Sequence, residues 1–377
     1  MRRRDFIINS ALALGGTALL TGCGKKEIQK SQNQVVRRKF KDTDMPLIAL
    51  GCMRLPMRND KIDMVELDKM VEYAMAHGAN YFDTAYMYVD GKSENAIGEV
   101  LKKYDRESFI LADKCPAYLV NSPSDVRKLC EEQLKKCQVK YFDNYMVHNI
   151  NKNTISNYRD NNMYEELLKL KNEGLIKNIG FSFHGDPAML REVIKEHKWD
   201  FCQLQINYLD WEVVNADELY QIADEAKVPV IVMEPLRGGV LCNLPDKAAQ
   251  KLKEECPDDT QASFGLRWVA SKERVFTILS GMSNLQQLKE NVDTFVNYRK
   301  LSEKEEKTAH QIAQIIQSQG AISCTACKYC MEVCPRGINI PAIFGLYNMY
   351  KGNSAPNAGF MFVYNYNALD ESTRADK

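Results

Sequence analysis

Two kinds of segment alternate along the chain from Met45 onward. Short, mostly apolar runs are followed by longer stretches in which apolar residues recur every three or four positions, as on one face of a helix. The runs predict eight strands, at residues 47–50, 81–83, 109–112, 145–148, 179–182, 201–206, 230–233 and 276–280. Helices are predicted between them, for example at residues 64–76 and 125–137. Strands that alternate with helices form a parallel sheet, and eight of them close into an α/β fold, the (β/α)8 TIM barrel.

The predicted barrel, residues 45–300, does not account for the whole chain of 377 residues. Barrels of this kind commonly take about 250 residues, so we expect one barrel with appendages at both ends. Residues 23–44 are polar and predict a tether, and residues 301–377 hold a charged helix, a cysteine-rich segment and a tail. The aromatic run at residues 360–369 is expected to cover the barrel mouth or the cysteines, or to pack on the barrel wall.

The first 22 residues have the features of an export signal. An arginine cluster precedes a modest apolar run from Phe6 to Leu20, which is shorter than the roughly 20 residues of a membrane-spanning helix. Residues 3–7 resemble the twin-arginine motif, and residues 20–23 resemble a lipobox. Together they predict export in the folded state, cleavage before Cys23 and a lipid on its thiol. The protein is then expected at the bacterial cell envelope, held by its lipid anchor only; an ordinary basic N-terminus is the alternative.

The charge balance excludes one class of partner. The 50 lysines and arginines equal the 50 aspartates and glutamates, and no extended basic block is present. Nucleic acid is therefore not an expected partner.

The segment NYFDTAYMYVDGKSENAIG, residues 80–98, places Asp83 at the end of a predicted strand and Tyr88 in the loop after it. In a barrel of alternating strands and helices, that rim is where chemistry takes place. The segment resembles the FDTAxxYxxGxSExxLG pattern of the aldo-keto reductase family, with Ile97 in place of the leucine. Two further landmarks follow in the family's order, at the ends of FILADK and YFDNYMVH. The resemblance implies a catalytic tetrad of Asp83, Tyr88, Lys114 and His148, and a small hairpin within residues 35–45.

These four residue types suit the reduction of a carbonyl. Hydride transfer builds negative charge on the carbonyl oxygen, so a proton donor has to be in place. A phenol has an unperturbed pKa of about 10. We expect the ammonium of Lys114 to lower the pKa of Tyr88, Asp83 to hold that lysine, and His148 to orient the carbonyl. Taken singly, each residue also fits an ordinary structural role.

The ends of the later strands carry candidate nucleotide contacts. The resemblance implies that Ser182 and Gln203 hold the nicotinamide carboxamide, and that Glu290 and Asn291 contact the adenine. After residues 230–233, glycines allow the backbone to approach a pyrophosphate that Arg237 could neutralise. A capping box of Ser283 and Gln286 would open a helix whose N-terminus offers N–H groups to phosphate. The complete set of expected contacts adds Leu236, Gly238, Gly281 and Gln287.

The sequence departs from the family pattern around this cofactor. Phe183 stands where the family has an asparagine, and Met233 where an aromatic residue usually stacks on the nicotinamide. No basic residue lies between Met282 and Gln287 to bind a 2′-phosphate. We therefore expect NADP or NAD as cofactor, with weak discrimination between them.

The cysteine-rich segment has the ferredoxin-type spacing C-x2-C-x2-C-x3-C-P, ending at Pro335. This spacing predicts a 4Fe-4S cluster; zinc, the alternative, favours paired C-x2-C units. In two-cluster ferredoxins the last cysteine binds the other cluster, and no second motif exists here. Either Cys334 folds back onto the single cluster, or Cys242 or Cys256 supplies the fourth ligand. The expected ligands are Cys324, Cys327, Cys330 and Cys334. Seven of the 12 cysteines remain besides these and Cys23, an odd number that argues against a disulfide framework.

Two functions follow from these features. The first is an exported oxidoreductase that transfers hydride between a nicotinamide cofactor and a small carbonyl or alcohol substrate. Its cluster would pass single electrons, from a redox partner protein, or act as a structural staple. The alternative is an electron-transfer or cluster-bearing binding module on an inactive reductase barrel. Nucleotide retained by the purified protein would favour the enzyme.

Overall fold

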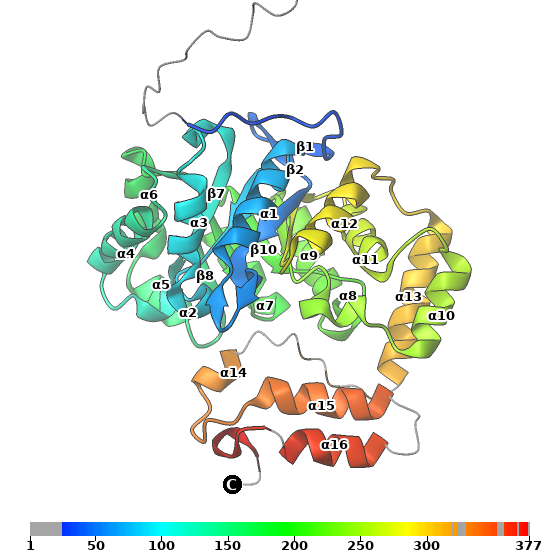
Figure 1. Cartoon of the computed structure of the whole chain (residues 1–377). Helices are drawn as coiled ribbons and strands as arrows, with labels where there is room; N and C mark the ends of the chain where they lie inside the picture. Colours follow the sequence, from blue (N-terminus) through cyan, green and yellow to red (C-terminus); the bar gives the residue numbers. More distant parts are fainter. Residues whose placement is uncertain are drawn as a thin grey trace, which may run out of the picture.

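The structure, a computed structural model, describes residues 25–318, 320, 322, 324, 329–352, 358–367 and 369–375. Eight parallel strands close into a barrel in the order β10-β11-β12-β3-β6-β7-β8-β9, with helices around the outside (Figure 1). The predicted (β/α)8 fold is confirmed. The barrel strands are β3 (Ile48–Gly51), β6 (Tyr81–Asp83), β7 (Ile110–Pro116), β8 (Phe142–Ile150), β9 (Ile176–Phe183), β10 (Phe201–Gln205), β11 (Val230–Met233) and β12 (Val275–Ser280).

The surrounding helices begin and end close to the predicted positions. The first, α1 (Met64–Ala76), matches its prediction; the Asp63 side chain caps it by accepting from the Glu66 N–H at 3.1 Å. Helix α4 begins at Pro123, two residues early, because Ser122 and Asp125 form a capping box. The others around the barrel are α3 (Ser93–Leu101), α5 (Ile155–Asp160), α6 (Met163–Asn172), α7 (Pro187–Glu196), α9 (Ala216–Glu225), α10 (Asp246–Glu255), α11 (Gln261–Ala270) and α12 (Leu285–Val296), with α4 ending at Lys136.

A hairpin of β1 (Arg37–Phe40) and β2 (Thr43–Pro46) closes the amino-terminal end of the barrel. Phe40 stacks on Phe276 at the start of β12, with ring centroids 4.4 Å apart, and Met45 is buried with it. The hairpin expected within residues 35–45 is therefore present. The preceding residues are packed on the barrel as well, since the Val35 N–H donates to the His77 carbonyl at 3.0 Å.

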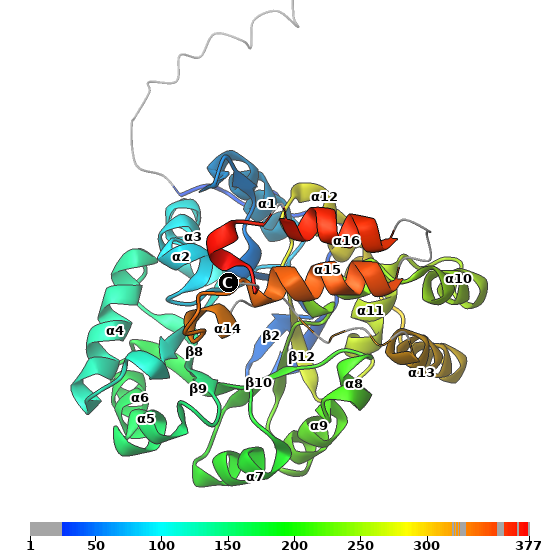
Figure 2. The same cartoon turned by 90° about the horizontal axis from the view of Figure 1, so that it is seen from below.

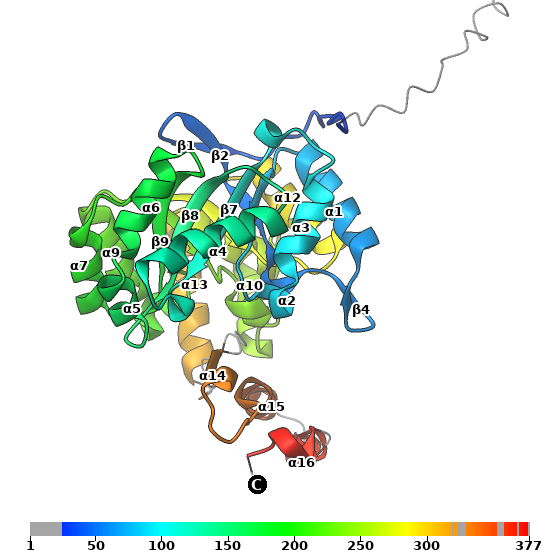
Figure 3. The ribbon, with the colours of Figure 1, turned by 90° about the vertical axis from the view of Figure 1, so that its left-hand side faces the viewer.

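The carboxyl-terminal segment lies at the opposite end of the barrel (Figure 3). After α13 (Glu303–Ser318), which packs against α10, come α14 (Tyr329–Glu332), α15 (Ile340–Gly352) and α16 (Ala358–Asn367). Helices α15 and α16 lie side by side across the end where the barrel strands terminate (Figure 2). The aromatic tail therefore lies over the barrel mouth, not on its wall. In the described part of the chain, no helix is both long enough and apolar enough to cross a membrane.

Candidate active site

The predicted tetrad is brought together at the carboxyl ends of three neighbouring strands, β6, β7 and β8. The ammonium of Lys114 donates to Asp83 Oδ1 at 2.5 Å and to the Thr84 carbonyl at 2.6 Å, and its side chain is completely buried. The same Nζ lies 4.6 Å from the centre of the Tyr88 ring. The His148 ring meets that ring edge-on, with centroids 6.2 Å apart. All four side chains therefore converge on one point.

A tight turn fixes the position of Tyr88. The short helix α2 (Tyr88–Gly91) contains Val89 and Asp90 with φ of 52° and 54°, in the left-handed region. The turn leads directly into α3, whose first residue anchors it: Ser93 Oγ lies 2.9 Å from Thr84 Oγ1 and donates to the Cys52 carbonyl at 3.0 Å. The backbone of the turn is thus held from both sides, and the phenol faces the cavity.

Electrostatics hold the phenol in its protonated form. Burial, followed by the charges of Asp83 and Glu234, raises the pKa of Tyr88 well above its ordinary value. The net direction is opposite to the expected lowering of the Tyr88 pKa, and its causes are burial and the carboxylates. The phenol therefore carries its proton at neutral pH, and the raised pKa makes it a weaker donor than an unperturbed phenol.

His148 is held neutral. Burial and the nearby charge of Lys114, followed by His184, lower the pKa of the His148 imidazole well below its ordinary value. Within the described part of the chain, its buried Nδ1 has no hydrogen-bond partner. A neutral ring with an unused polar atom can bind a carbonyl or alcohol oxygen without adding charge to the site.

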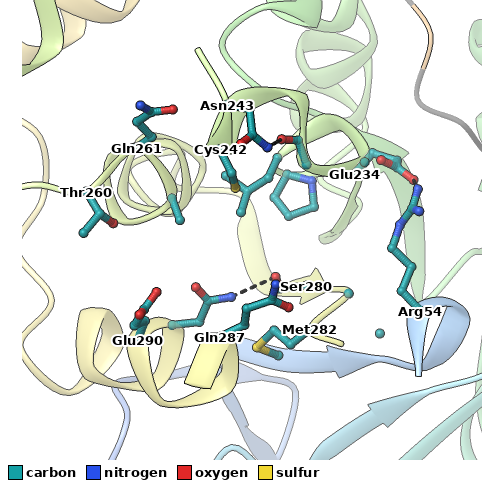
Figure 4. Close-up of a pocket in the computed structure, with 18 of the residues that line it drawn as sticks. Arg54, Glu234, Cys242, Asn243, Thr260, Gln261, Ser280, Met282, Gln287 and Glu290 are labelled. Carbon is teal, nitrogen blue, oxygen red and sulfur yellow. Dashed lines mark hydrogen bonds and ion pairs between the residues drawn. The ribbon is translucent and has the colours of Figure 1, made fainter. Parts of the chain in front are cut away.

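Two members of the tetrad, Asp83 and Tyr88, line a cavity of about 990 Å³. One wall is the turn η4 (Arg237–Cys242) with the segment before it, and the other is α12; Figure 4 shows Cys242 and Asn243 across from Gln287 and Glu290. The volume is at the upper end of those typical of ligand pockets. The expected nucleotide contacts that line it are Gln203, Leu236, Gly238, Gly281, Ser283, Gln287, Glu290 and Asn291.

Two expected contacts do not line this cavity. Arg237 is buried in an ion pair with Asp210, with Nη2 3.0 Å from Oδ1. This corrects its expected role at a phosphate, because its guanidinium is turned to the carboxylate. Ser182 is also buried, and its Oγ accepts from the Asn149 N–H at 2.7 Å.

The amino end of α12 also differs from the expectation. Asn284 caps the helix by accepting from the Gln287 N–H at 2.9 Å, so the cap is Asn284 and not the expected capping box of Ser283 and Gln286. The Ser283 N–H donates to Gln287 Oε1 at 2.8 Å. The N–H groups of Ser283 and Gln287, at the helix end expected to bind phosphate, therefore already have protein partners.

The cavity nevertheless suits a nicotinamide nucleotide. At its inner end the buried Gln203 has an Oε1 without a partner among the described residues, and its Nε2 has only the Met233 sulfur at 3.5 Å. Such an amide can pair with a carboxamide. Farther out, Gly238 and Gly239 have φ of 63° and 95°, and a Cβ on Gly239 would meet open space. A long groove with an amide at one end and glycine backbone along one wall fits a nicotinamide nucleotide.

Sequence reasoning missed an ion pair that spans this groove. Arg54, in the turn η1 (Cys52–Arg54) after β3, lies 3.9 Å from Glu234, which follows β11 (Figure 4). Between these two strands is β12, so the pair crosses the end of that strand. The position of Arg54 just after a predicted strand is the signal that could have found it.

Three of the four candidate cluster cysteines are described by the structure. Cys324, Cys330 and Cys334 are partly buried in the segment between α13 and α15, whereas Cys327 and the lipidation candidate Cys23 lie outside the described residues. Tyr329, next to Cys330, contacts His184 just after β9, with ring centroids 6.1 Å apart. The segment therefore meets the barrel at its catalytic end. Of the alternative ligands, Cys242 lines the nucleotide cavity and Cys256 is buried at the end of α10.

Comparisons with known proteins agree with this geometry. Residues 47–314 match the model of the Aldo/keto reductase family. The uncharacterized oxidoreductase YqkF of Bacillus subtilis is 26% identical over 296 residues, which cover 71% of this chain and 92% of YqkF. The NADH-specific methylglyoxal reductase of Escherichia coli is 26% identical over 281 residues, 63% of this chain and 85% of that protein. The solved aldo-keto reductase AKR11C1 of Bacillus halodurans shares the fold, with a TM-score of 0.63 and 24% identity over 74% of this chain and 96% of its own. The chain belongs to the aldo/keto reductase family of oxidoreductases.

Proposed function

We propose that the protein transfers hydride between a nicotinamide nucleotide and a small carbonyl or alcohol substrate, with Tyr88 as proton donor or acceptor. The observation that carries this proposal is the contact of Lys114 with both Asp83 and the Tyr88 ring at the inner end of the cavity. When bound, the dihydronicotinamide supplies the hydride that adds to the carbonyl carbon. Tyr88 gives its proton to the carbonyl oxygen as charge develops there, and Lys114 stabilises the phenolate that remains. The neutral His148 orients that oxygen.

Binding of nucleotide and reduction of a carbonyl test this proposal together. We expect calorimetric titration to show binding of NADH or NADPH, and absorbance of the reduced nucleotide to fall when an aldehyde is added. Methylglyoxal is a suitable first probe, because the E. coli relative bears its name. If neither nucleotide binds and the iron centre undergoes reversible reduction, the protein is a cluster-bearing module on an inactive barrel.

Cofactor choice depends on the outer half of the cavity. Ser283 and Gln287 line it with neutral side chains, and Glu290 adds a carboxylate. A 2′-phosphate would gain no ion pair from these three residues, and the cations of the lining, Arg54 and Lys253, come from η1 and α10 instead. We therefore expect NADH to be favoured over NADPH. The name of the NADH-specific E. coli relative supports the same choice.

Replacing Ser283 with arginine is expected to shift this preference. A guanidinium at the cavity wall can pair with a 2′-phosphate, so KM for NADPH should fall about tenfold relative to KM for NADH, the equivalent of about 1.4 kcal/mol. Gln286→Arg is the matched control, because it adds the same charge three residues farther along, in the first turn of α12 and outside the cavity lining. An equal shift in both variants would assign the effect to long-range charge and contradict the proposed position of the phosphate.

We propose further that Cys324, Cys327, Cys330 and Cys334 bind a 4Fe-4S cluster. The motif spacing supports this, and so does the location of three of the cysteines in one short segment. The contact of Tyr329 with His184 supports a cluster close to the active site. There it would either pass single electrons from a redox partner protein or hold the segment in place.

Iron analysis of anaerobically purified variants tests the ligand set. We expect about four irons per chain and a visible absorbance band that Cys330→Ser or Cys334→Ser greatly reduces. Cys242→Ser and Cys256→Ser serve as controls and should retain the band. If Cys334→Ser keeps the band and one of the two controls loses it, the fourth cluster ligand is the cysteine replaced in that control and not Cys334.

We also propose that the protein is lipid-anchored through Cys23 at the cell envelope. Lys25 donates to the Lys102 carbonyl at 2.7 Å, so the chain reaches the barrel at the end opposite α15 and α16 (Figure 3). An anchor there would leave the catalytic end, with α15 and α16 across it, facing away from the membrane. Labelling of cells with a radioactive fatty acid tests this, and absence of label from the protein would contradict it.

A further inference from the structure

A fully buried polar cluster lies directly behind Lys114, between β7 and the helices α3 and α4. Its centre is the Gln133 amide, whose Nε2 lies 2.8 Å from Glu94 Oε1, 2.9 Å from Asp113 Oδ1 and 3.0 Å from the Lys114 carbonyl. Tyr145 donates to Gln133 Oε1 at 2.6 Å, which fixes the amide with its nitrogen toward the acids. Two carboxyl groups of completely buried side chains therefore share one donor.

If both acids are ionised, the cluster has fewer hydrogen-bond donors than acceptors. An amide nitrogen carries two hydrogens, yet three acceptors surround this one. Glu94 has a cation, because Lys136 Nζ lies 3.2 Å from its second oxygen. Asp113 has no ion pair among the described residues; its other oxygen faces the Cys137 thiol at 3.7 Å. Two adjacent buried carboxylates with one cation are unfavourable, and a proton on one of them removes the conflict.

We propose that Glu94 and Asp113 hold one proton between them, carried by Asp113 at neutral pH, and that the pair positions Lys114 and Tyr88 for catalysis. The catalytic part rests on the function proposed above. The groups that face Asp113 include Glu94, Lys114, Asp83, Cys137 and Tyr145, from α3, β7, β6, the end of α4 and β8, with Lys136 beyond Glu94. The charge of Asp113 also acts on Tyr88, Cys52, Cys115 and Cys130. Burial, followed by the charge of Glu94, raises the pKa of Asp113 well above its ordinary value. This direction agrees with the shortage of hydrogen-bond donors in the cluster.

The pair is connected to both catalytic groups. Asp113 Oδ1 accepts from the Lys114 N–H at 2.8 Å, so this carboxyl is attached to the strand at the catalytic lysine. Glu94 lies in the first turn of α3, immediately after the turn that carries Tyr88. Through Gln133 the pair therefore ties the segment of Tyr88 to the strand of Lys114. A charge on Asp113 would also raise the pKa of Tyr88 and make it a weaker donor, so the proton on Asp113 favours catalysis.

Infrared difference spectroscopy detects the proton directly. We expect the carbonyl band of a protonated carboxylic acid in the unmodified protein and its loss in Asp113→Asn. Glu94→Gln should weaken the band, because loss of the Glu94 charge lowers the pKa of Asp113 while burial, the larger cause, still raises it. Asp143→Asn is the control and should leave the band unchanged, since Asp143 lies outside the cluster and is paired with Arg106 at 2.6 Å and with Lys177 at 2.8 Å. A band that persists in Asp113→Asn, or is absent from the unmodified protein, would overturn the shared proton.

Kinetics test the positioning role. Asp113→Asn keeps the shape of the neutral acid, so kcat should stay within about threefold, whereas Asp113→Ala should lower kcat by about tenfold to a hundredfold with KM little changed. An equal loss of kcat in both variants would contradict a neutral Asp113. An unchanged kcat in Asp113→Ala would contradict the positioning role. If Asp113→Ala does not fold, Asp113→Asn still tests whether Asp113 is neutral. Its pH profile of kcat should match that of the unmodified protein only if residue 113 is uncharged in both. If no form of the protein reduces a carbonyl, the proposed function fails, while the infrared band still tests the proton.

Discussion

Tyr88→Phe is expected to lower kcat for carbonyl reduction by about 10²–10⁴-fold, the usual contribution of a positioned general acid. The substitution removes the only atom of the side chain that can give a proton and leaves the ring that lies against Lys114 and His148. KM and nucleotide affinity should change little, because the ring still fills its place beside the cavity. Steady-state kinetics with NADH and methylglyoxal, with calorimetric nucleotide binding, measure these quantities.

The matched control is Tyr86→Phe in the same segment. Tyr86 also has a lysine over its ring, with Lys136 Nζ 4.0 Å from the centroid, but it does not line the cavity. We expect kcat of this variant within about twofold of the unmodified protein, as for a substitution away from the reacting atoms. A Tyr88→Phe variant as active as Tyr86→Phe would remove Tyr88 from the mechanism, and another donor would have to be sought.

The barrel could be predicted from the sequence because its strands are covered on both sides. Parallel strands buried on both faces appear as short apolar runs, and β6 and β11 begin and end where those runs do. The boundaries of β7 and β8 were missed because these strands continue through polar residues. Lys114 and Asn144 are completely buried within them and have hydrogen-bond partners that only the folded structure supplies.

The tetrad could be predicted because a local motif and the order of strand ends place it. Contacts between segments that are far apart in the sequence could not be predicted. Arg237 seemed free to meet a phosphate until the structure showed Asp210 against it. Likewise, Gln133 follows Glu94 by 39 residues and Asp113 by 20, and no local pattern joins them. Side chains paired through space are therefore the part of the site that the sequence alone did not reveal.

Lys114→Met is expected to have the largest effect on stability. It removes the ammonium from the completely buried Asp83, whose second oxygen already lacks a partner among the described residues, and leaves an uncompensated buried carboxylate. Breaking such a pair typically costs about 3–5 kcal/mol of the free energy of unfolding. Urea denaturation at pH 7 measures the loss. Lys103→Met is the control, because its pair with Asp68 at 2.6 Å is partly exposed and should be worth no more than about 1 kcal/mol.

The pH dependence of this loss identifies its cause. Burial raises the pKa of Asp83 in the folded protein, and Lys114 opposes that rise, so the Lys114→Met variant should have a still higher Asp83 pKa. A carboxyl whose pKa is higher folded than unfolded binds more protons in the native state, so stability increases as pH falls through the folded pKa toward the unfolded value of about 3.9. The deficit of Lys114→Met relative to the unmodified protein should therefore shrink between neutral pH and pH of about 4. Asp83→Asn combined with Lys114→Met should recover much of the stability at pH 7, because no buried charge remains. A deficit that is independent of pH and persists in the double variant would instead assign the loss to packing and to the Thr84 hydrogen bond.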